Sequence, residues 1–387
     1  MIGRRRRLLT IAHSYAVGMN RRLAHELALA GGWDVTAVAP ARFRGDFAWH
    51  TVEPLPGEAC AVAPVPAHFT RRVHVMLYGR ALASLLAQPW DLVHAWEEPY
   101  IAAGAQIAAW TPAGVPLVYA TFQNIAKRYP PPFGWFERYA LARADAMIAF
   151  GQTGRRLLED RGFRGRPVRV IPPGVDVAHF RPDGRLRAST LSALGWADDT
   201  PTVGFLGRFV PEKGLALLMS ALDRVPPPWR ALLVGSGPLE PELRAWAARH
   251  GDRVRVATGV LHDQVAAYLN AMDLLCAPSQ TTAGWREQFG RMLIEAFACG
   301  VPVVASDSGE IPWVVADAGV IVGERDAGAW TRAIADLVAD PERRRGLAAL
   351  GLRRASSVFA WSVVARQHVD FFEELVAVRG TADRRAV

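Results

Sequence analysis

The sequence predicts an α/β protein with two doubly wound domains, each built around a parallel sheet. Three observations lead to this prediction. The 387 residues are too many for one ordinary hydrophobic core. Short, continuous apolar runs alternate with stretches of helical periodicity, as they do in βαβ units around a parallel sheet. This alternation begins at Leu8, is interrupted by a proline-rich segment, and restarts at Thr202.

The apolar runs give the expected strands, and the periodic stretches between them give the expected helices. In the first half, strands are expected at 8–12, 35–39, 92–95, 117–121, 146–149 and 168–171. The helices between them are expected at 20–30, 72–87, 100–110, 135–143 and 153–161. In the second half, strands are expected at 203–206, 231–234, 254–257, 274–277 and 303–305, with helices near 215–222, 239–249, 262–271 and 290–299.

The segment Ile171-Pro-Pro-Gly-Val-Asp176, followed by the proline at 182, has the composition of a domain linker. We therefore expect an N-terminal domain over 1–175, completed by a C-terminal helix at 360–380, and a second domain over 176–359. Both domains would be of the Rossmann type and would face each other across a cleft. The carboxyl ends of the strands would line that cleft, because open α/β sheets bind their ligands there.

Composition narrows the class of protein. A hydrophobic content of 51% with 21% charged residues is typical of a globular chain, and no apolar run is long enough to predict a membrane-spanning helix. The basic start at 1–7 is followed by only a short apolar run and no small-residue cleavage site, so we expect a buried first strand and a cytoplasmic protein. Cys60, Cys276 and Cys299 are odd in number and lack metal-ligand spacing, which predicts reduced, mostly buried thiols.

The net charge of +8 hides a bias toward arginine. Among 45 basic residues only Lys127 and Lys213 are lysines, so the arginine runs carry little information while each lysine calls for a chemical reason. A basic surface can meet nucleic acid, anionic lipid or phosphorylated substrates. The sequence shows no zinc-finger spacing, RNA-binding aromatic motif or basic zipper, so nucleic acid is not an expected partner.

The strongest motif holds two carboxylates, Glu287 and Glu295, in the run E-Q-F-G-R-M-L-I-E. Gly290 opens the helix expected there, and the unpaired N–H groups of a first turn suit anionic oxygens. One carboxylate could take the ribose hydroxyls of a nucleotide while the other meets a sugar. The alternative is a capped surface helix with two solvated glutamates, but the following A-F-A-C-G-V-P-V-V favours a functional site.

A second motif, G-R-F-V-P-E-K-G, directly follows the strand expected at 203–206. A strand, a glycine-bearing loop and a helix start together favour phosphate binding. Arg208 and Lys213 would add two positive charges against a diphosphate, and an ammonium fits a confined site as a compact charge. The alternative is a loop with two solvated cations.

These two motifs in this order resemble glycosyltransferase family 4. The linker I-P-P-G-V-D, the V-G-S-G at 234–237 and the F-A-W at 359–361 are similar to that family as well. The resemblance covers 91–372 and is most specific over 203–304. It implies the GT-B fold and transfer of a sugar from a nucleotide donor, with retention at the anomeric carbon and without a catalytic metal or other cofactor.

The resemblance also implies roles for particular residues. Arg208 and Lys213 would bind the donor diphosphate and, together with Glu287, carry the chemistry. Glu295 would hold the ribose hydroxyls, and Glu287 would contact the transferred sugar. The other donor-binding positions that the resemblance implies are Gly18, Phe289, Gly290 and Arg291.

The chain departs from the family pattern in places. Family members often carry two glycines in the first βα loop, and here Gly18 stands alone. Many carry a histidine in a T-F-H context, where this chain has Gln123, an amide that cannot exchange a proton near pH 7. Transfer remains expected, because in this family the leaving phosphate can accept the proton of the acceptor. Glu310 and Trp313 stand in a segment where many members read G-G-I-P-E.

Polar residues that follow the N-terminal strands are candidates for acceptor binding. They are His13, Glu97, Glu98, Gln123, Asn124 and Lys127. The alternative for the two glutamates is a favourable position at a helix N-terminus, and His94 is expected to be a core histidine. Arginines of this domain could touch the anionic inner face of the cell membrane, where each contributes about 1 kcal/mol of binding free energy. They could also simply reflect the arginine bias.

The predicted function is transfer of a hexose-type sugar from a nucleoside diphosphate to a glycan or lipid-linked acceptor, as in polysaccharide biosynthesis. Two alternatives stay open. One is a nucleotide-sugar epimerase of the same fold, and the other is a catalytically idle scaffold that binds nucleotide sugars, which Gln123 in place of histidine suggests. A dinucleotide-dependent dehydrogenase is disfavoured because neither domain carries G-x-G-x-x-G.

Overall fold

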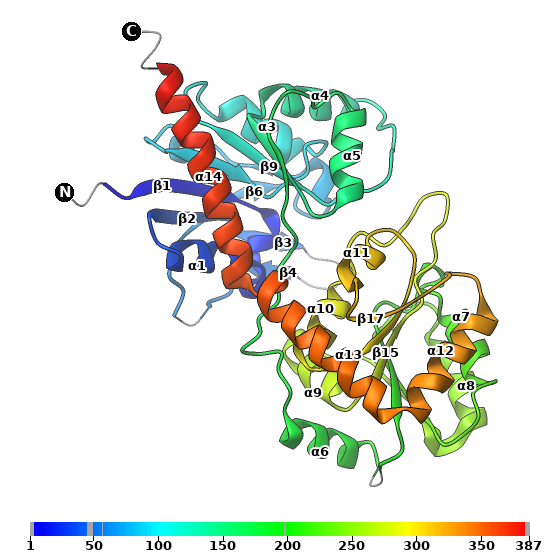
Figure 1. Ribbon diagram of the computed structural model, residues 1–387. Helices are drawn as coiled ribbons and strands as arrows, with labels where there is room; N and C mark the ends of the chain where they lie inside the picture. Colours follow the sequence, from blue (N-terminus) through cyan, green and yellow to red (C-terminus); the bar gives the residue numbers. More distant parts are fainter. Residues whose placement is uncertain (1–3, 45–48, 56, 197–198, 384–387) are drawn as a thin grey trace. The chain divides into compact units, whose positions relative to one another are not determined.

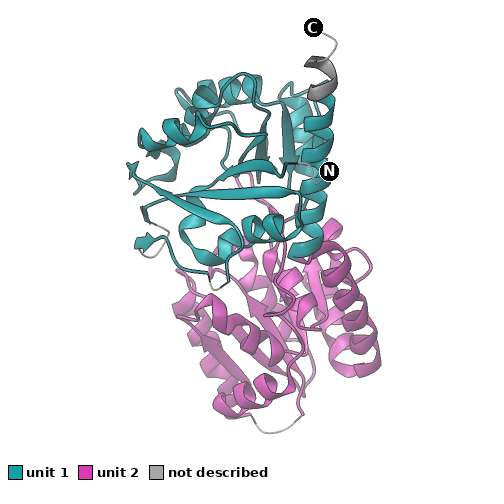
Figure 2. Cartoon of the chain, turned by 90° about the vertical axis from the view of Figure 1, so that its left-hand side faces the viewer, with its two compact units in different colours: residues 1–172, 361–387 teal, residues 173–360 magenta. Residues whose placement is uncertain are grey.

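The computed structural model describes residues 4–44, 49–55, 57–196 and 199–383. The chain divides into two compact units (Figures 1 and 2). Unit 1 comprises residues 1–172 and 361–387, and unit 2 comprises residues 173–360. The chain therefore crosses from one unit to the other twice. Val175 and Ala360, which lie next to the two crossings, form an isolated parallel bridge.

Unit 1 is built on a seven-stranded sheet with the order β11-β10-β9-β8-β1-β2-β5, in which each neighbouring pair is parallel. The strands are β1 (Arg6–Ile11), β2 (Trp33–Pro40), β5 (Ala61–Val65), β8 (Leu92–Ala95), β9 (Leu117–Thr121), β10 (Ala146–Ala149) and β11 (Val168–Val170). From β1 the chain proceeds outward to β2 and β5. It then returns to the other side of β1 and continues outward from β8. The winding direction thus switches between β1 and β8.

One expected helix of unit 1 is wrong. Within 72–87 only α2 (Ala81–Leu86) is an α-helix, because β7 (Leu77–Tyr78) pairs with β6 (Ala67–His68) before it. Gly79 follows β7, and a Cβ on it would lie 3.0 Å from the Pro66 carbonyl oxygen, so this close approach favours glycine. A second small antiparallel pair joins β3 (Arg42–Arg44) and β4 (Trp49–Thr51).

Helices cover the sheet of unit 1 (Figure 1). They include α1 (Arg22–Leu29), α3 (Ala102–Trp110), α4 (Phe133–Arg143), α5 (Gln152–Asp160) and α14 (Trp361–Asp383). The long helix α14 belongs to this unit although it follows unit 2 in the sequence. Its residues Val364, Ala365 and Phe372 are fully buried in the same core as Leu8 and Trp33.

Unit 2 is built on a six-stranded sheet with the order β14-β13-β12-β15-β16-β17, and all its pairs are parallel. The strands are β12 (Thr202–Leu206), β13 (Arg230–Val234), β14 (Val254–Ala257), β15 (Leu274–Ala277), β16 (Val303–Ser306) and β17 (Gly319–Val322). The α-helices are α6 (Gly184–Ala193), α7 (Leu215–Leu222), α8 (Glu240–His250), α9 (Val265–Asn270), α10 (Arg291–Ala298), α11 (Ile311–Val315), α12 (Ala327–Ala339) and α13 (Pro341–Arg354). Here the winding direction switches between β12 and β15.

Both units are therefore doubly wound parallel-sheet α/β structures, which confirms the predicted fold class. The core strands carry apolar side chains on both faces: β8, β9, β10, β15 and β16 are buried along their whole length. The three cysteines are buried and free, as expected. Over the described ranges, no helix is both long and apolar enough to cross a bilayer.

Candidate active site

Each sheet has one point at which the winding direction switches, and polar side chains gather there in both units. Neighbouring loops leave a parallel sheet in opposite directions at such a point, which opens a crevice at the carboxyl ends of the strands. In unit 2 the loops after β12 and β15 meet at the switch point. In unit 1 the segments after β1 and β8 meet.

The unit 2 switch point holds a buried ion pair between Lys213 and Glu287. The Nζ of Lys213 lies 2.5 Å from Oε2 of Glu287, and the two side chains are 12% and 8% exposed. Ser279 donates a hydrogen bond of 2.8 Å from its hydroxyl to the same carboxylate oxygen. The ammonium also lies 5.1 Å from the ring centre of Trp285, a cation–π contact. The pair thus fixes a cation and a carboxylate side by side at the end of the sheet.

Two glycines allow the loops to come this close. Gly214 has a φ of 71°, and a Cβ on it would lie 1.8 Å from the carbonyl oxygen of Pro278, directly after β15. Gly309 has a φ of 58°, and a Cβ on it would lie 2.0 Å from the carbonyl oxygen of Glu287. Any side chain at either position would push the loops apart. The backbone amide of Glu310 donates to the same Glu287 carbonyl at 3.2 Å.

Glu295 lies inside α10 and is only 6% exposed. The nearest basic side chains are those of His262 and Arg291, whose nitrogens lie 3.8 and 4.0 Å from Oε1, beyond hydrogen-bond distance. Burial raises the pKa of Glu295 to about 7, although the charge of Arg291 opposes the shift. Burial, followed by the charges of Arg291 and His179, lowers the pKa of His262 to about 4. No motif in the sequence pointed to His262 as a site residue.

The other predicted donor residues of unit 2 lie directly after β12 and at the start of α10. Arg208 follows β12, its side chain is 59% exposed, and it lies 3.8 Å from Glu212. The ring of Phe289 packs into the core against Trp313 and Phe359, so only the backbone at this position is open to a ligand. Gly290, with a φ of 83°, is the N-cap of α10. Arg291 is exposed in the first turn of that helix.

The unit 1 switch point is occupied by the carboxylate of Glu97, which is 2% exposed. Its Oε1 accepts a hydrogen bond of 2.5 Å from the backbone amide of His13 and one of 3.0 Å from the hydroxyl of Tyr78. Its Oε2 lies 2.5 Å from Nδ1 of the same histidine. These three contacts fix the imidazole ring, whose side chain is 28% exposed, at the carboxyl end of β1.

This arrangement favours the charged form of His13. Burial alone would lower the pKa of the imidazole, but the charge and hydrogen bond of Glu97, with a smaller contribution from Glu98, raise it above its usual value. With Nδ1 engaged by Glu97, the second ring nitrogen of an imidazolium is an N–H donor for a ligand. Tyr78, which completes the network, was missed because it lies in the stretch that was expected to be helical.

Glu98 forms a second network with residues at the end of β9. It accepts hydrogen bonds from the Thr121 hydroxyl at 2.8 Å, the Phe122 amide at 2.7 Å and the Gln123 side chain at 3.4 Å. The side-chain oxygen of Gln123 in turn accepts a bond of 2.8 Å from Arg161. Burial raises the pKa of Glu98 to about 7, although the three donors oppose the shift. Gln123 is thus held at both ends of its amide.

Three other predicted residues lie outside these contacts. Asn124 is buried directly after Gln123. Lys127 is exposed, and its backbone carbonyl accepts a hydrogen bond from Arg161 at 3.1 Å. The amide of Gly18 donates to the Glu53 carboxylate at 3.1 Å, so a phosphate at that amide would have to displace the carboxylate. His94 is fully buried, as expected for a core histidine.

Lys213 pairs with Glu287 at one switch point, and His13 pairs with Glu97 at the other. Within the parts of the chain that the structure describes, no group of three or more histidine, cysteine, aspartate or glutamate side chains is arranged to hold a metal ion.

Comparison with known proteins identifies the class. The chain matches the family described as glycosyl transferases group 1 over residues 188–351 and the one described as Glycosyltransferase Family 4 over residues 19–179. A D-inositol 3-phosphate glycosyltransferase from Xylanimonas cellulosilytica is 32% identical over 345 residues, which cover 83% of this chain and 78% of the relative. The chain belongs to glycosyltransferase family 4 and is a glycosyltransferase.

Other relatives and solved structures agree with this class. A GDP-mannose-dependent monoacylated alpha-(1-6)-phosphatidylinositol monomannoside mannosyltransferase from Corynebacterium glutamicum is 32% identical over 204 residues, which cover 51% of this chain and 54% of the relative. Sucrose-phosphate synthase from Thermosynechococcus elongatus has the same fold, with a TM-score of 0.74, 24% identity and coverage of 97% of this chain and 100% of that one. Anabaena HepE, solved in complex with UDP and glucose, has a TM-score of 0.73 and 22% identity. The match covers 95% of this chain and 100% of that one. These neighbours are GT-B glycosyltransferases, which confirms the GT-B fold.

Proposed function

We propose that this glycosyltransferase moves a hexose-type sugar from a nucleoside diphosphate to a hydroxyl of a glycan or lipid-linked acceptor, with retention at the anomeric carbon and without a metal ion. The observation that carries the donor part is the buried Lys213–Glu287 pair at the switch point of unit 2. A solved neighbour of the same fold binds UDP and glucose, which supports a nucleotide-sugar donor.

The chemistry follows from where charge develops. The bond between the anomeric carbon and the phosphate oxygen breaks, and its electron pair leaves with the diphosphate. The acceptor oxygen forms the new bond to the anomeric carbon, and its proton passes to the leaving phosphate. Lys213, assisted by Arg208, would stabilise the negative charge that grows on the diphosphate, which is the position where a fixed cation lowers the barrier.

In this proposal the two carboxylates bind different parts of the donor. Glu287 orients the ammonium of Lys213 and contacts hydroxyls of the transferred sugar. Glu295 is buried and has no charged neighbour within hydrogen-bond distance in the described chain, so ribose hydroxyls can serve as its donors. The backbone amides around Gly290 and Arg291, at the start of α10, can donate hydrogen bonds to the same ligand.

We assign the acceptor to the unit 1 switch point. The imidazolium of His13 and the half-buried Glu98 offer a donor and an acceptor of hydrogen bonds, as binding of a hydroxylated ligand requires. Relatives named for D-inositol 3-phosphate and for a phosphatidylinositol monomannoside support a polyol-type acceptor, free or attached to lipid.

A peripheral contact with the inner face of the membrane belongs to the same proposal. Phe69 is 68% exposed, Trp135 57% and Trp49 41%, and the guanidinium of Arg42 lies 4.4 Å from the ring centre of Trp49. Exposed aromatic rings, and an arginine beside one of them, suit the interface of an anionic bilayer.

The donor is tested by thermal shift with UDP-, GDP- and ADP-sugars. A ligand at 100 times its dissociation constant adds about 2.7 kcal/mol of stability, which is readily measured. The stabilising donor is then incubated with polyol and lipid-linked acceptors, and the anomeric configuration of the product is read by NMR. An inverted product would overturn retention.

The same experiment separates the two alternatives. An idle scaffold is the one favoured by a specific observation, because Gln123 stands where the family histidine is expected and its amide is held by Glu98 and Arg161. A scaffold would bind the donor and yield neither transfer nor hydrolysis with any acceptor. An epimerase would convert the nucleotide sugar to an isomer in the absence of an acceptor.

A further inference from the structure

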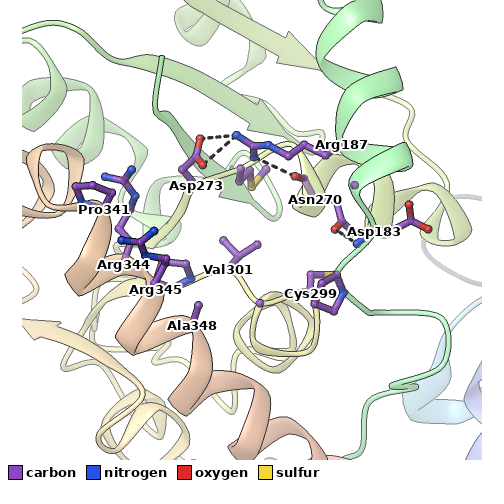
Figure 3. A pocket seen from close by; sticks show the side chains of 15 residues that line it. Asp183, Arg187, Asn270, Asp273, Cys299, Val301, Pro341, Arg344, Arg345 and Ala348 are labelled. Atoms are coloured by element: carbon purple, nitrogen blue, oxygen red, sulfur yellow. Dashed lines mark hydrogen bonds and ion pairs between the residues drawn. The ribbon is translucent and has the colours of Figure 1, made fainter. Parts of the chain in front are cut away.

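Unit 2 has a cavity of about 360 Å³ at the opposite end of its sheet from the Lys213–Glu287 pair. Asp273, which directly precedes β15, and Val301 and Pro302, which directly precede β16, line it. These residues lie at the amino ends of the strands, whereas the donor site lies at the carboxyl ends. The volume falls at the lower end of the range for small-ligand pockets. Figure 3 shows the cavity between α6, α9 and α13.

Three arginines face this cavity, and the two aspartates that line it are already engaged. Asp273 accepts bonds of 3.0 and 3.1 Å from Arg187 and a bond of 2.9 Å from the amide of Thr202. Asp183 caps α6 by accepting bonds from the amides of Arg185 and Leu186 at 2.9 and 3.0 Å. Asp273 thus pairs with Arg187, and neither aspartate lies within ion-pair distance of Arg344 or Arg345.

Arg344 is held rigidly but not neutralised. Its Nη1 donates to the carbonyls of Leu337 and Val338 in the last turn of α12, the second at 2.7 Å. No carboxylate of the described residues lies within ion-pair distance of its guanidinium. Arg345, the next residue on α13, lies 3.5 Å from Glu342, but the two side chains are 74% and 88% exposed, so that pair is weak. Arg344 thus provides a fixed positive charge at the cavity, and Arg345 provides a second, exposed one.

We propose that this cavity binds a small phosphorylated metabolite. A guanidinium presents a planar set of N–H donors that matches phosphate oxygens, and Arg344 and Arg345 both line the cavity from adjacent positions on α13. The opposite wall is apolar, formed by Met272, Val301 and Pro302, and can receive the uncharged part of the ligand. The thiol of Cys299 lines the cavity as well, and burial raises its pKa to about 12, so it stays neutral beside the anion.

The position of the cavity makes its ligand an effector rather than a reactant. Two elements run from the cavity to the donor residues. β15 begins after Asp273 and ends before Ser279, which bonds to Glu287. α10 begins at Arg291, carries Glu295 and ends before Cys299. A ligand that shifts either element at one end therefore changes the geometry of the donor site at the other, and the donor must change the affinity of the effector by the same factor.

The test is isothermal titration of the full-length protein with glucose 6-phosphate, inorganic phosphate and uncharged glucose. We expect saturable binding of one or both phosphates and none of glucose. Because phosphate can also enter the donor site, each titration is repeated in the Lys213→Ala variant. Binding that persists in this variant does not require the Lys213 cation of the donor site, and this result does not depend on whether the proposed transferase activity is correct.

Two variants and a control locate the ligand. Arg344→Gln removes the fixed charge, and Ala348→Phe fills the cavity from α13 without touching the bonds of Arg344. We expect each to weaken binding by at least about tenfold. Arg343→Gln lies on the same helix, is exposed and does not line the cavity, so it should bind like wild type. No saturable binding to wild type, or binding that is lost in Lys213→Ala but kept in Ala348→Phe, would overturn the proposal.

Discussion

Lys213 Nζ lies 2.5 Å from Glu287 Oε2, although the two residues are 74 positions apart in the sequence. The contact exists because β12 and β15 are neighbours in the sheet and each residue follows one of them. An ammonium paired with a buried carboxylate keeps its position without a ligand. A site of this kind is organised before the donor arrives, which is the condition under which a charge stabilises a transition state most strongly.

The first prediction concerns the shape of this cation. Lys213→Ala should lower kcat by roughly 10²–10³, the scale of removing one preorganised charge-stabilising donor. Lys213→Arg keeps the charge, but the guanidinium is planar and larger, so at least about a tenfold loss of kcat is expected. Arg332→Lys, on the exposed surface of α12, is the matched control. Wild-type turnover in Lys213→Arg, with the same melting temperature, would remove Lys213 from the phosphate site.

The second prediction uses the raised pKa of Glu295. Glu295→Gln should weaken donor binding by about 1.5–3 kcal/mol, the range for hydrogen bonds to a charged group, as measured by calorimetry at pH 8. In the wild type, donor affinity should fall as the pH drops below the pKa of about 7, because the neutral carboxyl is a poorer acceptor. The variant should show no such fall.

The stability of the free protein provides a separate check on the same residue. Between pH 4.5 and 7 the folded chain retains a proton on Glu295 that the unfolded chain has lost, so this residue makes stability decrease as the pH rises through that window. Glu295→Gln should therefore be more stable than the wild type at pH 8 while it binds the donor less well. Equal stability of the two proteins at pH 8 would contradict the assignment of a raised pKa.

The third prediction concerns metal ions. If Lys213, Arg208 and helix amides neutralise the leaving diphosphate, addition of EDTA should leave the transfer rate within about twofold. The measurement is an initial rate with dialysed enzyme, followed by addition of magnesium or manganese. A rate that collapses in EDTA and recovers with either metal would show that the charge is neutralised in another way.

The fourth prediction addresses the acceptor. Glu97→Gln retains the shape of the side chain but removes the charge that raises the pKa of His13. We expect the acceptor KM to rise by roughly ten- to a hundredfold, in line with a lost hydrogen bond to a charged group, while donor affinity stays the same. Glu159→Gln, an exposed carboxylate on α5, serves as control. A change in donor affinity of equal size would point to a general disturbance of the fold.

The fifth prediction concerns acid stability. His368 of α14 is fully buried 5.7 Å from the ring of His94, and burial lowers its pKa to about 4. From pH 6.5 down to pH 4 the unfolded chain therefore binds a proton that the folded chain excludes, and stability falls as the pH falls. His368→Phe should flatten this decline in thermal unfolding, whereas His74→Gln at an exposed position should not. Parallel curves for wild type and His368→Phe would contradict the prediction.

Much of the fold was predictable because the central strands have continuous apolar sequences. The strands at 92–95, 117–121, 146–149, 254–257 and 274–277 have the predicted bounds. The helix predicted over 72–87 was not correct. Its apolar spacing suited a helix as well as a strand, and the pairing of β7 with β6 produces a strand there. Strand β5 was missed because Pro64 interrupts it, and a proline is tolerated there since β5 is at the edge of the sheet.

The sequence predicted individual residues of the site but not the contacts between them. The motifs indicated Lys213, Glu287 and His13 as separate candidates, because each follows an apolar strand. Which candidates meet depends on strand order, and local sequence does not encode the order in which strands assemble. Partners such as Ser279 and Tyr78 belong to common residue types in ordinary loops, and only the folded chain distinguishes them.

The placement of α14 governs the order in which the molecule can be made. Unit 2 is one continuous segment, whereas unit 1 needs Val364, Ala365 and Phe372 to close the core around Leu8 and Trp33. On the ribosome the first-made unit must therefore wait with an open apolar face while the second is synthesised and folds. Domains that fold as units normally do so from the N-terminus onward. In this chain the later segment is complete first, and the earlier one is exposed to chaperones and aggregation until its last helix emerges.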